Sequence, residues 1–207
     1  MVANKVKKTV KKWKQYHKIS NVGTITRRYF VMNAFDGALT MLGVVIGAYI
    51  ANINNPGIII SAGVAGSIAM GVSGISGAYM TEKAERTKKL KDLESAMITD
   101  LKDGLHGKSY KFAAAFAAII DGVSPALAAM VVISPFFIVN FGVISFQTAY
   151  YSSIGLTLLV LTLLGAYLAK ISDENMIKYG LQMLIVGIIT AFICILTSIL
   201  IGGNTIA

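Results

Sequence analysis

The apolar residues of this chain are concentrated in five long stretches, which short polar segments separate. Each stretch exceeds the roughly 20 residues that an α-helix needs to cross a hydrocarbon core about 30 Å thick. The pattern therefore predicts an all-α integral membrane protein with five transmembrane helices. We expect the spans at about residues 29–51, 57–80, 110–133, 146–169 and 176–201.

The first 28 residues carry nine Lys and Arg and no acid. Four apolar side chains recur on one face of a helix there, with lysines around the rest: Val2, Val6, Val10 and Trp13. Such a helix lies on the membrane surface and binds anionic lipid through its basic face. We therefore expect a basic amphipathic cytoplasmic arm over residues 1–28, whose surface helix ends at the Asn21-Val22-Gly23 break, and a membrane domain over residues 29–201.

Three of the later polar or irregular segments have distinct expected roles. The second span is expected to continue into the cytoplasm as a charged helix over residues 81–103, since no Gly or Pro stops it before Asp103-Gly104. The uncharged segment 134–145 is expected to lie at the outer interface, with a break near Asn140 and Gly142. Ser172-Asp173-Glu174 is expected to cap the fifth span.

Charge sets the orientation. Nine of the 19 Lys and Arg lie in residues 1–28, eight lie in 83–111, and Lys170 and Lys178 are the other two. In a five-span arrangement all of them fall on one side, which puts the N-terminus in the cytoplasm and the C-terminus outside. The net charge of +9 therefore does not indicate a nucleic-acid partner.

Composition agrees with this class of protein, with 55 % hydrophobic residues, 14 % charged residues and a mean hydropathy of +0.68. The first apolar run starts too late and is too long for a cleavable signal peptide. We expect a prokaryotic cell membrane protein. The single cysteine, Cys194, lies in an apolar run and matches no redox or zinc-ligand spacing.

Two acids lie inside the predicted spans, each followed by glycine: Asp36-Gly37 and Asp121-Gly122. They lie roughly 12 and 15 Å past the nearest basic residue, in spans that run in the same direction. A carboxylate at that depth costs at least about 2.5 kcal/mol unless it faces a polar cavity, a partner or an ion. Two such carboxylates in one bundle could hold a divalent cation or relay protons, whereas protonation or pairing within the bundle is the structural alternative.

Further candidate ligands lie in and beyond the second span. Met70, with Met41 and Met80, offers a thioether that suits Fe²⁺ better than Mg²⁺ or Ca²⁺, although methionine is also a common lipid-facing residue. Glu82 and Glu85 share a helical face at the predicted cytoplasmic end of this span. They could collect cations, or form ion pairs with Arg86 and Lys89 four residues on.

The sequence has no hydrolase elbow, P-loop, HExxH motif or dinucleotide-binding loop, so we expect no enzyme. The order Arg27-Arg28, Asp36-Gly37, Gly63-Val64-Ala65-Gly66 and Met70 resembles the vacuolar iron transporter family. The resemblance covers the first two spans best. It implies five spans, a homodimer, and exchange of Fe²⁺ or Mn²⁺ for protons that moves metal out of the cytoplasm. Cofactors are not implied, since the metal is the substrate.

By this resemblance, Asp36 is a transport-site ligand, Met70 a candidate second ligand, and Glu82 and Glu85 lie on the extension that carries cytoplasmic metal ligands. The chain departs from the family at Ser73-Gly74-Ile75, where a Gly-Glu-Tyr motif is usual, and residues 81–109 are too few for a three-helix metal-collecting domain. We hypothesise that Asp121 replaces the missing glutamate.

The leading hypothesis is therefore a homodimeric exporter of Fe²⁺ or Mn²⁺ that works by proton exchange. Two alternatives remain open at this point. One is a non-transporting membrane protein whose basic arm and cytoplasmic helix recruit a partner or lipid. The other is a transporter of another cation or a small solute.

Overall fold

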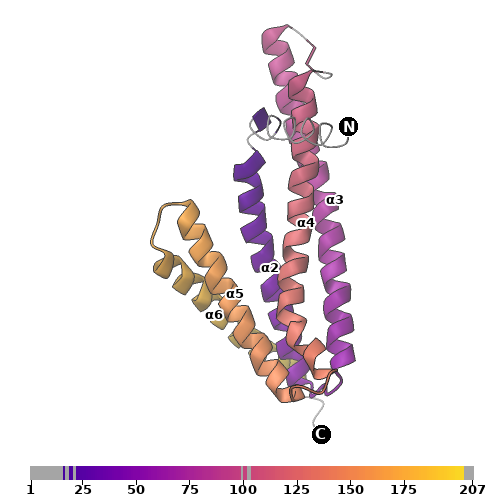
Figure 1. Ribbon diagram of the computed structural model, residues 1–207, viewed down its shortest axis with the longest axis vertical. Helices are drawn as coiled ribbons and strands as arrows, with labels where there is room; N and C mark the ends of the chain where they lie inside the picture. The colour runs from indigo at the N-terminus through magenta and orange to yellow at the C-terminus, as the bar shows by residue number, and fades with distance from the viewer. Residues whose placement is uncertain (1–15, 17–18, 21, 99, 102–103, 203–207) are drawn as a thin grey trace, which may run out of the picture. The chain divides into compact units, whose positions relative to one another are not determined.

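The computed structural model describes residues 16, 19–20, 22–98, 100–101 and 104–202. The described chain is helical, without strands, and five of its helices are long and apolar enough to cross a membrane (Figure 1). They are α2 (Val22–Ile50), α3 (Pro56–Met97), α4 (Leu105–Val139), α5 (Phe146–Ile171) and α6 (Met176–Gly202). The predicted all-α fold with five transmembrane helices is confirmed. The apolar face proposed for the basic arm falls on residues 2–13, outside the described residues.

Side-chain caps set where α3 and α5 begin. The Asn55 side-chain oxygen accepts from the Gly57 N–H at 2.9 Å, and Pro56 occupies the first position of α3, where a missing N–H costs nothing. The Ser145 hydroxyl oxygen accepts from the Thr148 N–H at 3.2 Å and caps α5.

The cap of α6 is a correction to the sequence prediction. Asn175 caps this helix, because its side-chain oxygen accepts from the N–H groups of Ile177 (2.9 Å) and Lys178 (3.2 Å). Ser172 instead ends α5, with its N–H donating to the Leu168 and Ala169 carbonyls. The prediction that Ser172-Asp173-Glu174 caps the fifth span was wrong, because Asn175 stands closer to the first turn.

Helix α3 runs without interruption from its apolar part into its charged part, as expected, and ends at Met97. Ile98 follows with φ of 51°, a left-handed conformation that stops the helix. The charged helix thus ends before residue 103. Nearer the N-terminus, α2 begins at Val22, so Val22 and Gly23 are helical and do not form the break that was predicted there.

Helix α4 passes through Pro125 and Pro135 and continues to Val139, beyond the expected end at residue 133. Pro135 has no N–H to give the Val131 carbonyl, and the Ser134 hydroxyl donates to that carbonyl at 2.7 Å instead. The turn before α5 contains Gly142 at φ of +71°. The expected break near Asn140 and Gly142 is therefore the only irregular part of segment 134–145 among the described residues.

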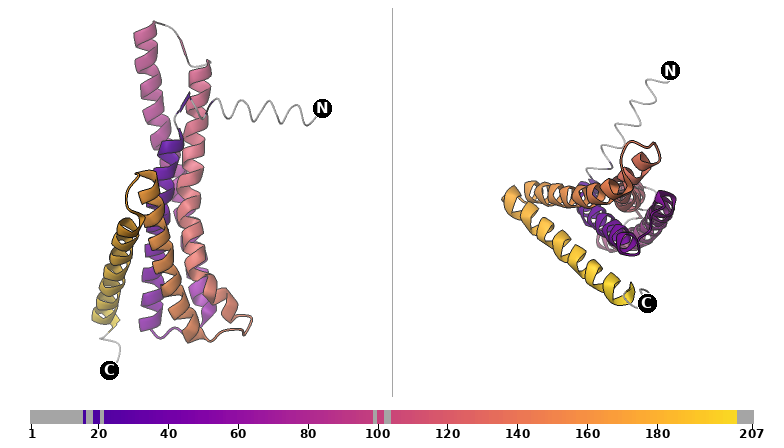
Figure 2. Two further views of the ribbon diagram at one scale, coloured as in Figure 1. Left: turned by 60° about the vertical axis from the view of Figure 1, so that its left-hand side comes forward. Right: turned by 90° about the horizontal axis from the view of Figure 1, so that it is seen from below.

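The chain forms two compact units, the first from Met1–Phe30 and Gly71–Val123 and the second from Val31–Met70 and Ser124–Ala207. In the second unit, buried side chains of α2, α3, α4 and α5 form one apolar core that includes Met41, Ile133, Phe136 and Leu161. Helix α6 runs back along α5 (Figure 2). These two helices approach closely at Gly165, where an added Cβ would lie 2.5 Å from the Tyr179 carbonyl oxygen.

In the first unit, the later part of α3 packs antiparallel to the early part of α4. The two helices approach closely at Gly122, where an added Cβ would meet the Gly71 carbonyl oxygen and the Ile75 backbone nitrogen. The small residues of the second span thus allow close helix packing.

Candidate functional site

Asp36 lies in the second unit, in the part of α2 that crosses the predicted membrane. Its side chain is exposed on the single chain, and Met32 and Thr40, one turn away on either side, are exposed as well. The next residue, Gly37, is buried against the backbone of Pro125, where an added Cβ would lie 2.6 Å from the Pro125 Cα. This contact fixes the rotation of α2, so that Asp36 points away from the core.

Met70 also lies in the second unit, on α3. It is half-buried and packs against the apolar core. Met41 is fully buried, with its methyl group 3.2 Å from where a Cβ on Gly66 would lie, and Met80 is 71 % exposed. Met41 is thus a core residue, whereas Met70 and Met80 lie outside the fully buried core.

Asp121 belongs to the first unit and lies at the crossing of α3 and α4. One of its carboxylate oxygens is 3.0 Å from where a Cβ on Gly74 would be, and Gly122 Cα is 2.8 Å from the same point. Gly74 therefore leaves room beside the half-buried Asp121 carboxylate. Any larger residue at position 74 would press on that carboxylate.

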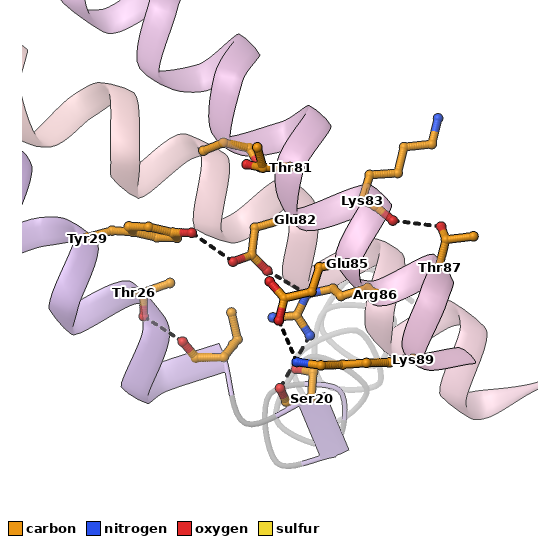
Figure 3. A network of polar contacts seen from close by, with 12 residues as sticks. Ser20, Thr26, Tyr29, Thr81, Glu82, Lys83, Glu85, Arg86, Thr87 and Lys89 are labelled. Atoms are coloured by element: carbon orange, nitrogen blue, oxygen red, sulfur yellow. Dashed lines mark hydrogen bonds and ion pairs between the residues drawn. The ribbon is translucent and has the colours of Figure 1, made fainter. Parts of the chain in front are cut away.

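Glu82 is the centre of a buried polar network in the first unit (Figure 3). It is only 3 % exposed. The Tyr29 hydroxyl donates to one carboxylate oxygen at 3.0 Å, and Arg86 Nε donates to the other at 2.9 Å. Arg86, 6 % exposed, also donates through Nη1 to the Ser20 carbonyl at 3.4 Å. Glu82 is thus the buried counter-ion of Arg86.

Glu85 has the opposite environment. Its side chain is 61 % exposed and accepts from Lys89 Nζ at 2.7 Å (Figure 3). Glu82 and Glu85 therefore both form the ion pairs that were the alternative to cation collection, with Arg86 and Lys89 respectively. An exposed pair of this kind separates readily, so Glu85 remains open to a cation, whereas Glu82 would first have to leave Arg86.

The five predicted ligands divide between the units: Asp36 and Met70 in the second, Asp121, Glu82 and Glu85 in the first. Among the described residues, no three His, Cys, Asp or Glu side chains gather into a group that could hold a metal ion. Sequence reasoning found the Glu82–Arg86 pair through its spacing but missed Tyr29 and Ser20. Tyr29 lies 53 positions from Glu82, and Ser20 lies 66 positions from Arg86, so no local sequence pattern links them.

Comparison with known proteins gives two matches. The profile of the VIT family matches residues 27–100 and 87–198. The chain is also 35 % identical over 172 residues to the uncharacterized protein MJ0645 of Methanocaldococcus jannaschii. That alignment covers 81 % of this chain and 85 % of the archaeal protein.

Proposed function

This chain belongs to the VIT family, a family of membrane metal-ion transporters, and from that premise we propose that it exports Fe²⁺ or Mn²⁺ from the cytoplasm in exchange for protons. It is an integral membrane protein with five helices able to span the bilayer. We propose the identity of the metal, the direction of transport and the coupling to protons; membrane metal-ion transport itself follows from the family. The oxygen and thioether donors Asp36, Asp121 and Met70 suit a transition metal of this kind.

The exposure of Asp36 is the observation that carries the proposal. A carboxylate in the middle of a span is expensive when it faces lipid, and is tolerated where it faces a polar pathway or a bound ion. Because Gly37 packs against the Pro125 backbone, α2 cannot rotate to bury Asp36 in its own core. The carboxylate is thus held in position for a ligand or a second protein surface.

A second copy of the chain is the partner we propose for this face. Met32, Asp36 and Thr40 form an exposed stripe along α2, at four-residue spacing. In a homodimer, two such stripes would place a carboxylate from each chain near the interface and remove both from lipid. This supports a site completed by two chains, in agreement with the absence of a three-ligand group among the described residues of one chain.

Flux into proteoliposomes tests the proposal. Under a pH gradient, wild-type proteoliposomes should take up Fe²⁺ and Mn²⁺. The flux through Asp36→Asn should be at least about tenfold lower, which corresponds to about 1.4 kcal/mol of transition-state stabilisation. Asp92→Asn, an exposed acid on the charged part of α3, is the matched control and should transport normally. Full flux in Asp36→Asn would overturn the site assignment.

The same assay separates the substrate from its alternatives. Unlabelled Fe²⁺, Mn²⁺, Mg²⁺ and Ca²⁺ are added as competitors, and Fe²⁺ should compete most strongly, because a thioether ligand suits it better than the harder Mn²⁺, Mg²⁺ and Ca²⁺. Competition by Mg²⁺ equal to that by Fe²⁺ would contradict the role of Met70. Correctly folded protein that carries none of these ions would favour the non-transporting alternative.

A further inference from the structure

A basic cavity of about 200 Å³ lies between α3 and α4 in the first unit. Three cationic side chains line it, Lys83 and Arg86 from α3 and Lys111 from α4. The remaining polar lining comes from Tyr79, Thr87 and Tyr110, and none of the acids that the structure describes lines the cavity. Its volume corresponds to about six or seven waters, so the cavity accommodates a solvated anion.

Arg86, which lines this cavity, has one hydrogen-bond donor without a partner among the described residues. Its Nε and Nη1 bond to Glu82 and to the Ser20 carbonyl, and its carbon Cζ lies 5.8 Å from the centre of the Tyr110 ring. Nη2 is buried and has no hydrogen-bond partner in the part of the chain that the structure describes. A buried donor without an acceptor is destabilising, and an anion beside Arg86 would supply the missing acceptor.

A wider and more open cavity of about 520 Å³ adjoins the first one. The two share Tyr79, Lys83 and Thr87, and the wider one adds Lys88 and Lys91. Lys83 Nζ lies 5.8 Å from the centre of the Tyr79 ring, which holds its charge near the common wall. Together the cavities form a continuous basic surface that no acid lines among the described residues.

The position along α3 identifies the class of anion. The apolar part of α3 ends at Met80, which lines the wider cavity and is 71 % exposed, and Tyr79 beside it is 42 % exposed. The basic surface therefore begins where the helix leaves the hydrocarbon. This is where phospholipid phosphates lie, and basic pockets between transmembrane helices bind such headgroups.

We propose that the cavity between α3 and α4 binds the phosphate of an anionic phospholipid. Lys83 and Lys111 flank the phosphate from the two helices, and Arg86 provides the buried charge behind it. The acyl chains lie along the exposed side chains of Tyr79 and Met80. Because Glu82 neutralises one of the three cations, the cavity retains a net charge close to +2, which matches a phosphomonoester headgroup.

The test compares lipid binding by matched variants of the full chain. Purified protein in neutral detergent micelles is titrated with dioleoylphosphatidic acid, and bound lipid is counted by native mass spectrometry. The variant Lys83→Gln/Lys111→Gln removes the two flanking charges. The control, Lys108→Gln/Lys170→Gln, removes two exposed lysines that line neither cavity.

Lys83→Gln/Lys111→Gln should bind the tightest lipid about 30-fold more weakly, because each lysine contributes a factor of about five to six in affinity. The control should change it less than about threefold, and Lys83→Arg/Lys111→Arg should retain binding. Lys83 and Lys111 are exposed, so these substitutions leave the folded core intact. Equal losses in the cavity and control variants would overturn the proposal, because they indicate diffuse charge attraction.

Two further titrations identify the source of the phosphate. Dioleoylphosphatidylcholine should fail to displace phosphatidic acid, since its headgroup carries no net charge. Inorganic phosphate at millimolar concentration should displace it only weakly, because it lacks acyl chains. Equally strong binding of inorganic phosphate, or no saturable phosphatidic acid site in the wild-type protein, would overturn the assignment to a lipid.

Discussion

The buried pair of Glu82 and Arg86 leads to a sharp prediction about stability. The two side chains are 4 % and 7 % exposed, so the pair is shielded from water. Removing one partner of a buried pair leaves an uncompensated charge and costs about 3–5 kcal/mol. For Glu82→Gln we expect about 3 kcal/mol, the low end of that range, because the amide oxygen can still accept one hydrogen bond.

The control for this prediction is Glu85→Gln, one turn away on the same helix. The Glu85–Lys89 pair is 61 % and 57 % exposed, and we expect its loss to cost less than about 1 kcal/mol, as for other exposed pairs. The double variant Glu82→Gln/Arg86→Met removes both buried charges and leaves an acceptor for Tyr29. It should recover most of the loss, to within about 1 kcal/mol of the wild-type protein.

The free energy of unfolding in mixed micelles, followed by far-ultraviolet circular dichroism across a dodecyl sulfate titration, provides the measurement. The reasoning is refuted if Glu82→Gln and Glu85→Gln destabilise the protein equally. It is also refuted if the double variant is less stable than Glu82→Gln alone. Either result would mean that Glu82 is not the counter-ion of a buried arginine, and its assignment to cation collection would gain support.

Two further predictions concern helix packing in the second unit. Gly37→Ala should destabilise the protein by about 3 kcal/mol in the same unfolding assay, because its Cβ would meet the Pro125 backbone, which cannot move aside. Gly155→Ala, where an added Cβ would have no neighbour within 4 Å, should be neutral or stabilise by up to about 1 kcal/mol. Equal destabilisation by the two substitutions would contradict the close contact between Gly37 and Pro125. Tyr150→Phe should cost about 1–2 kcal/mol, because its buried hydroxyl donates to the Ile53 carbonyl at 2.8 Å; a cost below about 0.5 kcal/mol would show that water replaces this bond.

Much of this fold follows from local sequence. The five spans are predictable because each is an apolar run longer than about 20 residues, which is enough for a helix to cross the membrane. The pairs at Glu82–Arg86 and Glu85–Lys89 follow from helical spacing alone. Helical spacing does not show that the first pair is buried and the second exposed, since the burial depends on Tyr29 and Ser20 from a distant segment.

The errors have equally local causes. The fifth span was given the wrong cap because three polar residues preceded Asn175, and spacing alone could not rank them. The third span was expected to end near residue 133, whereas α4 continues to Val139. Ser134 bonds the carbonyl that Pro135 leaves open, so the helix continues.

The pair Tyr150-Tyr151 at the start of the fourth span is, from sequence alone, typical of an interfacial aromatic belt. Tyr151 is 59 % exposed as expected, whereas Tyr150 is 3 % exposed and packs edge-on against Phe136. Adjacent residues on a helix face different directions, and only the position of the neighbouring helices decides which one is buried.

Exchange of metal for protons is the central proposal for this protein. Proteoliposomes loaded with a pH-sensitive dye test it directly, with Mn²⁺ added outside and no initial pH gradient. Exchange predicts that Mn²⁺ entry drives protons out and raises the internal pH, and that Asp36→Asn abolishes the change. Mn²⁺ entry in the wild-type protein without any change in internal pH would contradict exchange.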